Sequence, residues 1–396
     1  MMPPEYLFGL VVILLPVAAL SGWYYGRKDA RERINSPAGV PGMSQDYFKG
    51  LNYLLNDRPD KAIEVFIKVL EVESETVETH LALGNLFRRR GEVDRAIRIH
   101  QNLVARPSLD KEQRALALLE LGIDYMRSGL LDRAETLFKE LIQTGMYERQ
   151  VLRHLVDIYQ QEQDWDAALE YIRRLERVTG EDMRDVRAHF YCEKAEIFKS
   201  ADNPPEAFRL LDRALKEDRK CVRARLLSAD LSSSVKDYST AIAHLKKIEH
   251  QDIDFLSEAI PRLADNYRKL DRVNELSAYL LRLSELHLGI TPVLVLAELA
   301  AERAGLDEAK NHIVAELKTR PTIRGIDRLI EYSMADADGE SRRNLQLLKE
   351  TTTRLVEDKL NYKCGNCGFT GRSLHWQCPS CKSWNTVKPI HGIEGE

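Results

Sequence analysis

The feature that most constrains the fold is a repeated pair of small residues in the middle of the chain. A glycine is followed twelve positions later by an alanine three times in succession: Gly50 and Ala62, Gly84 and Ala96, Gly122 and Ala134. Equivalent positions continue at intervals of 33 to 39 residues as far as Ala309. A period of this length indicates supersecondary units that bury their apolar faces only by stacking on their neighbours.

This spacing resembles that of tetratricopeptide repeats. In that family, small residues on the two helices of a repeat let the helices approach closely, and bulky neighbours fill the gaps between pairs. Glycine stands at the expected turn in three repeats: Gly91, Gly129 and Gly305. We therefore expect an all-α superhelix of about eight or nine repeats over residues 44–357, ending in a degenerate helix pair at 322–357. Such a superhelix has a long concave surface suited to peptides or folded partners.

Four of the six cysteines form two Cys-x-x-Cys pairs near the end of the sequence: Cys364 with Cys367, and Cys378 with Cys381. Each pair can curl into a knuckle with both sulfurs at one centre, and four thiolates suit zinc or a single iron. Local disulfides are disfavoured, because Cys-x-x-Cys pairs in a reducing compartment indicate metal or redox sites. A four-thiolate site is closed, so His375 between the knuckles is not expected to be a ligand.

Both knuckles look like those of a rubredoxin-type or zinc-ribbon β module, which we place at residues 358–396 and call the metal module. We expect each knuckle to lie between two strands, and Lys382 to strain the second turn, where the family usually has glycine. The module could dock on the last repeats or present a face to a partner. The remaining cysteines, Cys192 and Cys221, are expected to be buried free thiols far from each other.

Residues 6–25 carry no charge, and a helix of that length spans the hydrocarbon core of a bilayer. Glu5 is the only charged residue before the apolar run, whereas four basic residues follow it: Arg27, Lys28, Arg31 and Arg33. A cleaved signal peptide would have its bases before the run. We therefore expect a transmembrane anchor at 1–26 and a basic juxtamembrane linker at 27–43, with the N-terminus periplasmic and the rest in the cytoplasm, where thiols stay reduced.

Composition and motifs argue against two classes of function. The chain has 58 basic and 62 acidic residues, without the basic excess of a nucleic-acid binder. No Walker loop, Gly-x-Ser-x-Gly elbow or His-Glu-x-x-His pair occurs, so we expect no catalytic residues and no organic cofactor. The arginine run from Arg88 to Arg98 is either a solvated helix face or a docking patch for an acidic partner or membrane phosphates.

The order of anchor, repeats and four-cysteine module, with the stretches 83–100, 189–192 and 384–390, resembles the lipopolysaccharide assembly protein B family of Gram-negative inner-membrane proteins. The resemblance implies a non-enzymatic adaptor that brings the lipid A pathway deacetylase to a membrane-bound ATP-dependent metalloprotease. It also implies a regulatory inner-membrane protein with a periplasmic domain as a partner, and one iron or zinc ion held by Cys364, Cys367, Cys378 and Cys381. A scaffold for other lipopolysaccharide assembly proteins, a rubredoxin-like redox protein and a homo-oligomer stay open.

Overall fold

A computed structural model describes residues 45–56, 58–72, 77–286, 289–357, 359–393 and 395. The chain divides into two compact units, Met1–His154 and Leu155–Glu396, which we call the N-terminal and C-terminal units. The expected membrane anchor at 1–26 and linker at 27–43 lie outside the described residues. Among the helices that are described, none combines the length and apolarity needed to cross a bilayer.

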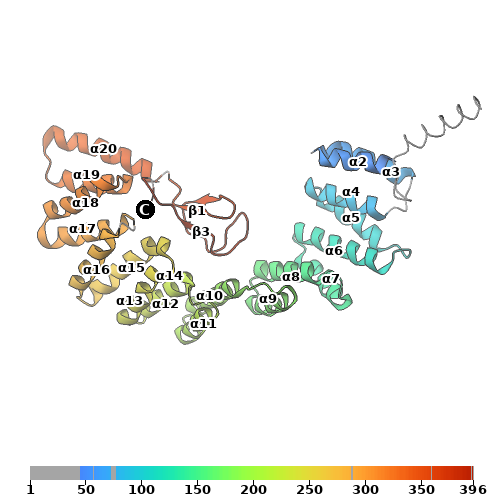
Figure 1. Cartoon of the computed structure of the whole chain (residues 1–396), viewed down its shortest axis with the longest axis horizontal. Helices are drawn as coiled ribbons and strands as arrows, with labels where there is room; N and C mark the ends of the chain where they lie inside the picture. The colour runs from blue at the N-terminus through green and yellow to red at the C-terminus, as the bar shows by residue number, and fades with distance from the viewer. Residues whose placement is uncertain are drawn as a thin grey trace, which may run out of the picture. The chain divides into compact units, whose positions relative to one another are not determined.

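The N-terminal unit consists of consecutive helices that pack in pairs (Figure 1). Its helices are α2 (Gln45–Leu55), α3 (Pro59–Val72), α4 (Val77–Arg89), α5 (Val93–Val104), α6 (Lys111–Arg127), α7 (Leu131–Thr144) and the first part of α8 (Glu148–Glu162). The strongest packing is within the pairs α2–α3, α4–α5 and α6–α7. These pairs are the helix–turn–helix units that the repeat predicts, and the all-helical expectation is confirmed here.

The glycines of the repeat let the two helices of a pair come close. A Cβ atom added at Gly50 would lie 2.7 Å from the Phe66 ring, so any larger residue would push α2 and α3 apart. The same contact recurs between Gly122 and Phe138. In the repeat between them, Gly84 faces the ring of a histidine, His100, instead of a phenylalanine.

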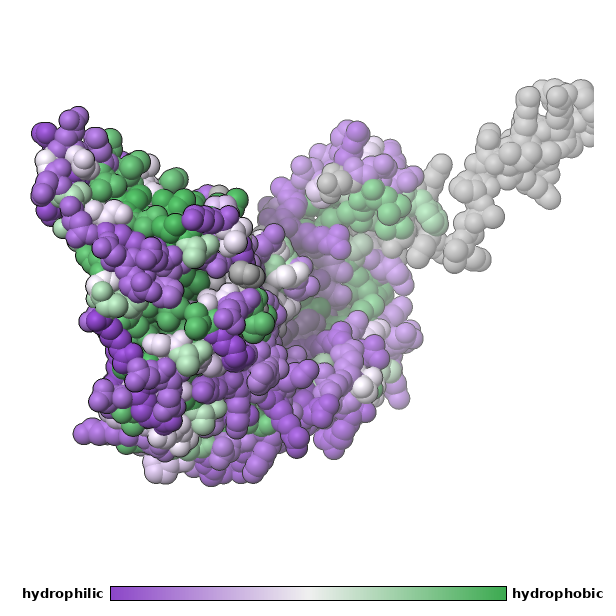
Figure 2. Space-filling model, turned by 60° about the vertical axis from the view of Figure 1, so that its left-hand side comes forward, coloured by the Kyte–Doolittle hydropathy of each residue, from purple (hydrophilic) through white to green (hydrophobic). Residues whose placement is uncertain are grey.

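The C-terminal unit continues the array and adds a small sheet. Its helices are α9 (Trp165–Thr179), α10 (Arg184–Ser200), α11 (Pro204–Glu217), α12 (Val222–Ser234), α13 (Tyr238–Lys246), α14 (Ile248–Gln251), η1 (Ile253–Phe255), α15 (Leu256–Lys269), α16 (Val273–Glu285), α17 (Thr291–Ala304), α18 (Leu306–Thr319), α19 (Ile323–Ala335) and α20 (Gly339–Glu357). The helix pair expected at 322–357 corresponds to α19 and α20. Most of the visible surface is hydrophilic, with apolar areas between (Figure 2).

The sheet of the metal module differs from the expected pattern. It consists of β1 (Tyr362–Cys364), β2 (Thr370–Gly371) and β3 (Val387–Pro389) in the order β2-β1-β3, with antiparallel pairing throughout. The prediction that the second knuckle lies between two strands was wrong. Between β2 and β3 the chain forms no further strand, and a single isolated bridge pairs Gln377 with Trp384 across the knuckle. Lys382 and Asn385 both have positive φ, which turns the chain out of an extended path and carries it to β3 beside β1.

Candidate metal centre and its attachment to the repeats

The structure brings the four predicted cysteines together. Their sulfur atoms all lie within 4.8 Å of one another. The Sγ atoms of Cys364 and Cys381 are 3.8 Å apart, and those of Cys367 and Cys378 are 3.6 Å apart. Metal–sulfur bonds of about 2.3 Å give a regular tetrahedron of sulfurs an edge of about 3.8 Å. The four thiols therefore have the spacing of a tetrahedral metal site and could bind one metal ion.

Each knuckle is closed by a backbone hydrogen bond and followed by a residue with positive φ. Gly368 N–H donates to the Cys364 carbonyl at 3.0 Å, and Lys382 N–H donates to the Cys378 carbonyl at 2.9 Å. The φ angles are 78° at Gly368 and 60° at Lys382. Glycine adopts this left-handed conformation without strain, whereas a residue with a Cβ atom pays roughly 1 kcal/mol. The departure noted in the sequence is thus a strained position in the structure.

Polar neighbours favour thiolates at two of the four cysteines. Hydrogen bonds from Ser383, with a further one from Asn366, lower the pKa of the Cys381 thiol to about 5. The Thr386 hydroxyl, 3.3 Å from Cys364 Sγ, lowers the pKa of that thiol as well. Burial instead raises the pKa of Cys378 to about 11. A bound cation would supply the charge that a buried thiolate at Cys378 needs.

His375 lies outside this cluster and contacts the Ser373 hydroxyl at 3.2 Å through Nε2. Four thiolates leave a tetrahedral ion without an open coordination position, as in structural sites. The arrangement is therefore suited to holding the two knuckles together.

Two tryptophans that flank the second knuckle attach the module to helices far away in the sequence. The Trp384 indole N–H donates to Gln160 Oε1 on α8 at 2.9 Å, and its ring stacks on His189 of α10 with centroids 5.0 Å apart. Trp376 stacks on Phe255 at 5.3 Å. The module was expected to dock on the last repeats or to face a partner. It packs mainly against helices in the middle of the sequence, and it also contacts the last helix pair, where Ile323 N–H donates to the Ile393 carbonyl at 2.9 Å.

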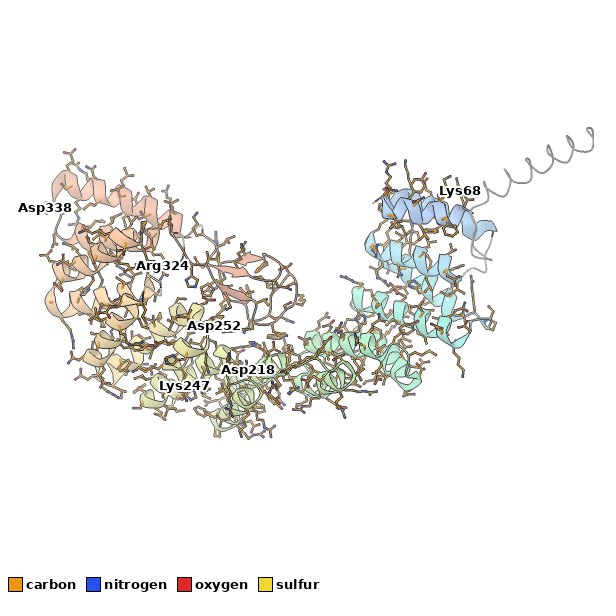
Figure 3. The ribbon with its side chains drawn as sticks, in the orientation of Figure 1. Lys68, Asp218, Lys247, Asp252, Arg324 and Asp338 are labelled. Carbon is orange, nitrogen blue, oxygen red and sulfur yellow. The ribbon has the colours of Figure 1, made fainter. Side chains whose placement is uncertain are left out.

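Polar contacts hold a second edge of the module. Lys388 Nζ lies 2.8 Å from Asp252 and 3.0 Å from Asp254, and the Tyr362 hydroxyl donates to Glu258. Figure 3 labels Asp252 on the helical side of this junction. These partners are more than 100 residues apart in the chain. No motif in the sequence marks them; sequence analysis missed them for that reason.

The arginine run from Arg88 to Arg98 is largely used inside the N-terminal unit. Arg88 is mostly buried and lies 2.8 Å from Asp124 and 2.6 Å from Glu120, both on α6. Asp124 is in turn 2.5 Å from His100 Nδ1. Arg90 and Arg95 each pair with Glu92, and Arg90 also pairs with Asp60. Most arginines of the run therefore already have an acidic partner within the unit. A docking patch built on the whole run is therefore not supported.

The two other cysteines are buried, as expected, but they are not far apart. The Cys192 and Cys221 thiols hydrogen-bond to each other between α10 and the start of α12. The expectation of separation was wrong because α10 and α12 pack against each other in the stacked array.

Comparison with known proteins agrees with both parts of the fold. Tetratricopeptide repeat families match residues 79–115 and 119–183, and a rubredoxin metal binding domain family matches residues 362–389. Lipopolysaccharide assembly protein B of Escherichia coli (strain K12) is 38% identical over 387 residues, covering 98% of this chain and 99% of the relative. The Haemophilus influenzae protein of the same name is 33% identical over 395 residues, covering 97% and 99%.

Among solved structures, Naa15/Naa10 bound to HypK-THB aligns with 80% of this chain and 52% of that chain, at 13% identity and a TM-score of 0.38. An alignment this loose adds nothing to the assignment.

Proposed function

This chain belongs to the lipopolysaccharide assembly protein B family, and we propose on that premise that it serves lipopolysaccharide assembly as a membrane-anchored, non-enzymatic adaptor. In this proposal it binds the lipid A pathway deacetylase and presents it to a membrane-bound ATP-dependent metalloprotease. The observation that carries the proposal is similarity to the Escherichia coli relative over 98% of this chain. A regulatory inner-membrane protein with a periplasmic domain would restrain the adaptor, and other lipopolysaccharide assembly proteins are further partners.

The physical advantage of an adaptor is local concentration. A repeat array held at the inner membrane by residues 6–25 keeps its captured substrate near a protease in the same membrane. Linking two binding events in this way converts the second into an intramolecular step and raises the overall affinity without any new contact. The array supports this role because stacked helix pairs provide extended surfaces for protein partners.

The metal module supports a structural contribution to the adaptor. When bound, an iron or zinc ion would join the two knuckles and couple their folding to metal binding. Gln160, His189 and Asp252 would then receive a rigid module instead of a loose segment. Four thiolates leave no coordination position for a substrate.

The decisive experiment measures the half-life of the deacetylase. Cells depleted of this chain, after a block of protein synthesis, should retain the deacetylase several-fold longer than cells that produce it. Wild type and Ser380→Ala should restore rapid loss, because Ser380 is exposed within the second knuckle and contributes no thiolate. Cys364→Ser should fail to restore it. An unchanged half-life on depletion would sink the adaptor proposal and leave the scaffold.

A further inference from the structure

A polar groove of about 420 Å³ lies between α9, α10 and α11. Four cationic side chains line it: Arg173 and Arg177 of α9, Lys194 of α10 and Arg213 of α11. Two carboxylates, Asp166 and Glu170, also line it. Since the whole chain has slightly more acidic than basic residues, this local excess of positive charge sets the groove apart.

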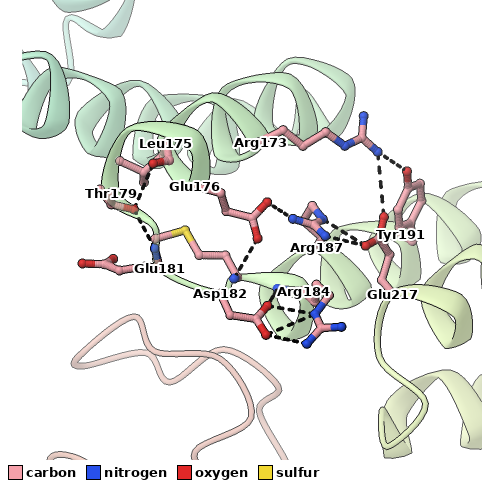
Figure 4. A network of polar contacts seen from close by, with 11 residues as sticks. Arg173, Leu175, Glu176, Thr179, Glu181, Asp182, Arg184, Arg187, Tyr191 and Glu217 are labelled. Carbon is pink, nitrogen blue, oxygen red and sulfur yellow. Dashed lines mark hydrogen bonds and ion pairs between the residues drawn. The ribbon is translucent and has the colours of Figure 1, made fainter.

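The walls of the groove are held in place by a polar network (Figure 4). Arg173 donates from Nη2 to the Tyr191 hydroxyl at 2.6 Å and lies 4.0 Å from Glu217 Oε1, which orients its guanidinium group over α10 and leaves its other nitrogens for a ligand. Behind it, the buried Arg187 pairs with Glu176 of α9 and with Glu217 of α11 at 2.6 Å. Because Arg187 ties all three helices together, the groove is largely formed before any ligand arrives.

Several of the cationic groups remain available. Arg177 and Arg213 are exposed, and among the described residues neither makes a hydrogen bond or a close ion pair, although the charge of Arg213 acts on Glu206. Lys194 pairs with Asp166, whose side chain is 80% exposed. Lys194 is mostly buried, with 18% of its side chain exposed, but Asp166 holds it from the solvent side, so an incoming carboxylate can take the place of Asp166.

We propose that this groove binds an extended acidic peptide segment of a partner protein. Arg173 and Arg177 stand four residues apart, close to one helical turn of about 5.4 Å. Alternate side chains of an extended peptide repeat every ~6.6 Å, so carboxylates at alternate positions can reach both guanidinium groups. Arginine binds a carboxylate through two parallel hydrogen bonds, so the groove should prefer a peptide whose carboxylates have this spacing over one whose carboxylates do not.

The groove stays accessible when the metal module is docked. His189, which stacks on Trp384 of the module, precedes Tyr191 of the groove by two residues. Two residues correspond to about 200° around a helix, so the two side chains leave α10 on opposite sides. The proposal deepens the adaptor function by naming the chemistry of one docking surface. It can succeed or fail whether or not the chain delivers a substrate to a protease.

The test is binding of a fluorescent peptide of alternating glutamate and serine to the full chain in detergent, followed by anisotropy at low salt. The double variant Arg177→Glu and Arg213→Glu should weaken binding at least about tenfold, because it changes two of the four positive charges in the groove to negative ones. The matched control is Arg342→Glu and Arg343→Glu, which makes the same charge change at two exposed arginines of α20. It should leave binding within about twofold.

The proposal would be overturned by no binding to wild type, by equal loss in both double variants, or by equal binding of a peptide with the same residues in separate glutamate and serine blocks. Complete displacement by low millimolar inorganic phosphate would also overturn it, since the groove would then be a site for small anions. Because Arg177 and Arg213 are exposed and make no close contact with a carboxylate, circular dichroism should show both variants folded as wild type.

Discussion

Acidification should weaken the packing of the metal module on the repeats through one buried histidine. His189 lies on α10 against Trp384, and burial lowers the pKa of its imidazole from 6.5 to about 3, with a smaller contribution from the charge of Arg223. Its Nδ1 atom is buried and has no hydrogen-bond partner among the described residues. Arg223 is itself paired with Glu193 and Glu196, so its charge is fixed beside the imidazole.

The magnitude follows from the two pKa values. Between pH 6.5 and about 3, the unfolded chain binds a proton at His189 that the folded chain does not. The free energy of unfolding therefore falls as the pH falls through this window and is unaffected above it. From pH 7.5 to 5.0 the loss is about 2 kcal/mol, and it approaches about 5 kcal/mol near pH 3.

The assay is urea unfolding of wild type and His189→Phe at several pH values from 7.5 to 5.0, followed by tryptophan fluorescence. Phenylalanine keeps a ring against Trp384 but cannot bind a proton. The difference in unfolding free energy between the two proteins should change by about 2 kcal/mol in favour of the variant as the pH falls. Protonation of the cysteines affects both proteins and cancels in this difference. Parallel pH dependence in the two would refute the reasoning.

Three further substitutions test the metal centre and the N-terminal unit. Lys382→Gly should relieve the left-handed strain and stabilise the metal module by about 0.5–1 kcal/mol, seen as slower metal loss to a chelator; faster loss would contradict this. Cys364→Ser should lower the bound metal from one ion per chain to none by elemental analysis, whereas full occupancy would show that three thiolates suffice. Arg88→Ala should leave Asp124 buried without its guanidinium partner and cost about 3 kcal/mol; hydrogen exchange across α4 to α6 should quicken, and unchanged protection would count against this role.

Features that depend on short stretches of chain could be predicted from the sequence. The glycine spacing led to helix pairs because the contact between Gly50 and Phe66 lies within one repeat. The two Cys-x-x-Cys pairs led to a four-thiolate cluster because each knuckle is a local turn and few residues separate the two. The strain at Lys382 was foreseeable for the same reason, since a tight turn demands its own backbone angles.

Contacts between segments that are far apart in the sequence were decided only by the tertiary structure. The stacking of helices places Gln160 and His189 beneath Trp384, although about 200 residues separate them in the chain. It also sets Asp124 against Arg88, which turns the start of an apparent basic patch into an internal ion pair.

Spacing along the chain determines which residues can form a repeat or a knuckle. It does not determine which face of the array a module packs on or which charges neutralise one another, because those depend on how successive repeats stack. The sequence alone therefore identified the helix pairs and the four clustered cysteines that could hold a metal ion. The docking of the metal module and the cationic groove between α9, α10 and α11 emerged only from the packing of the folded chain.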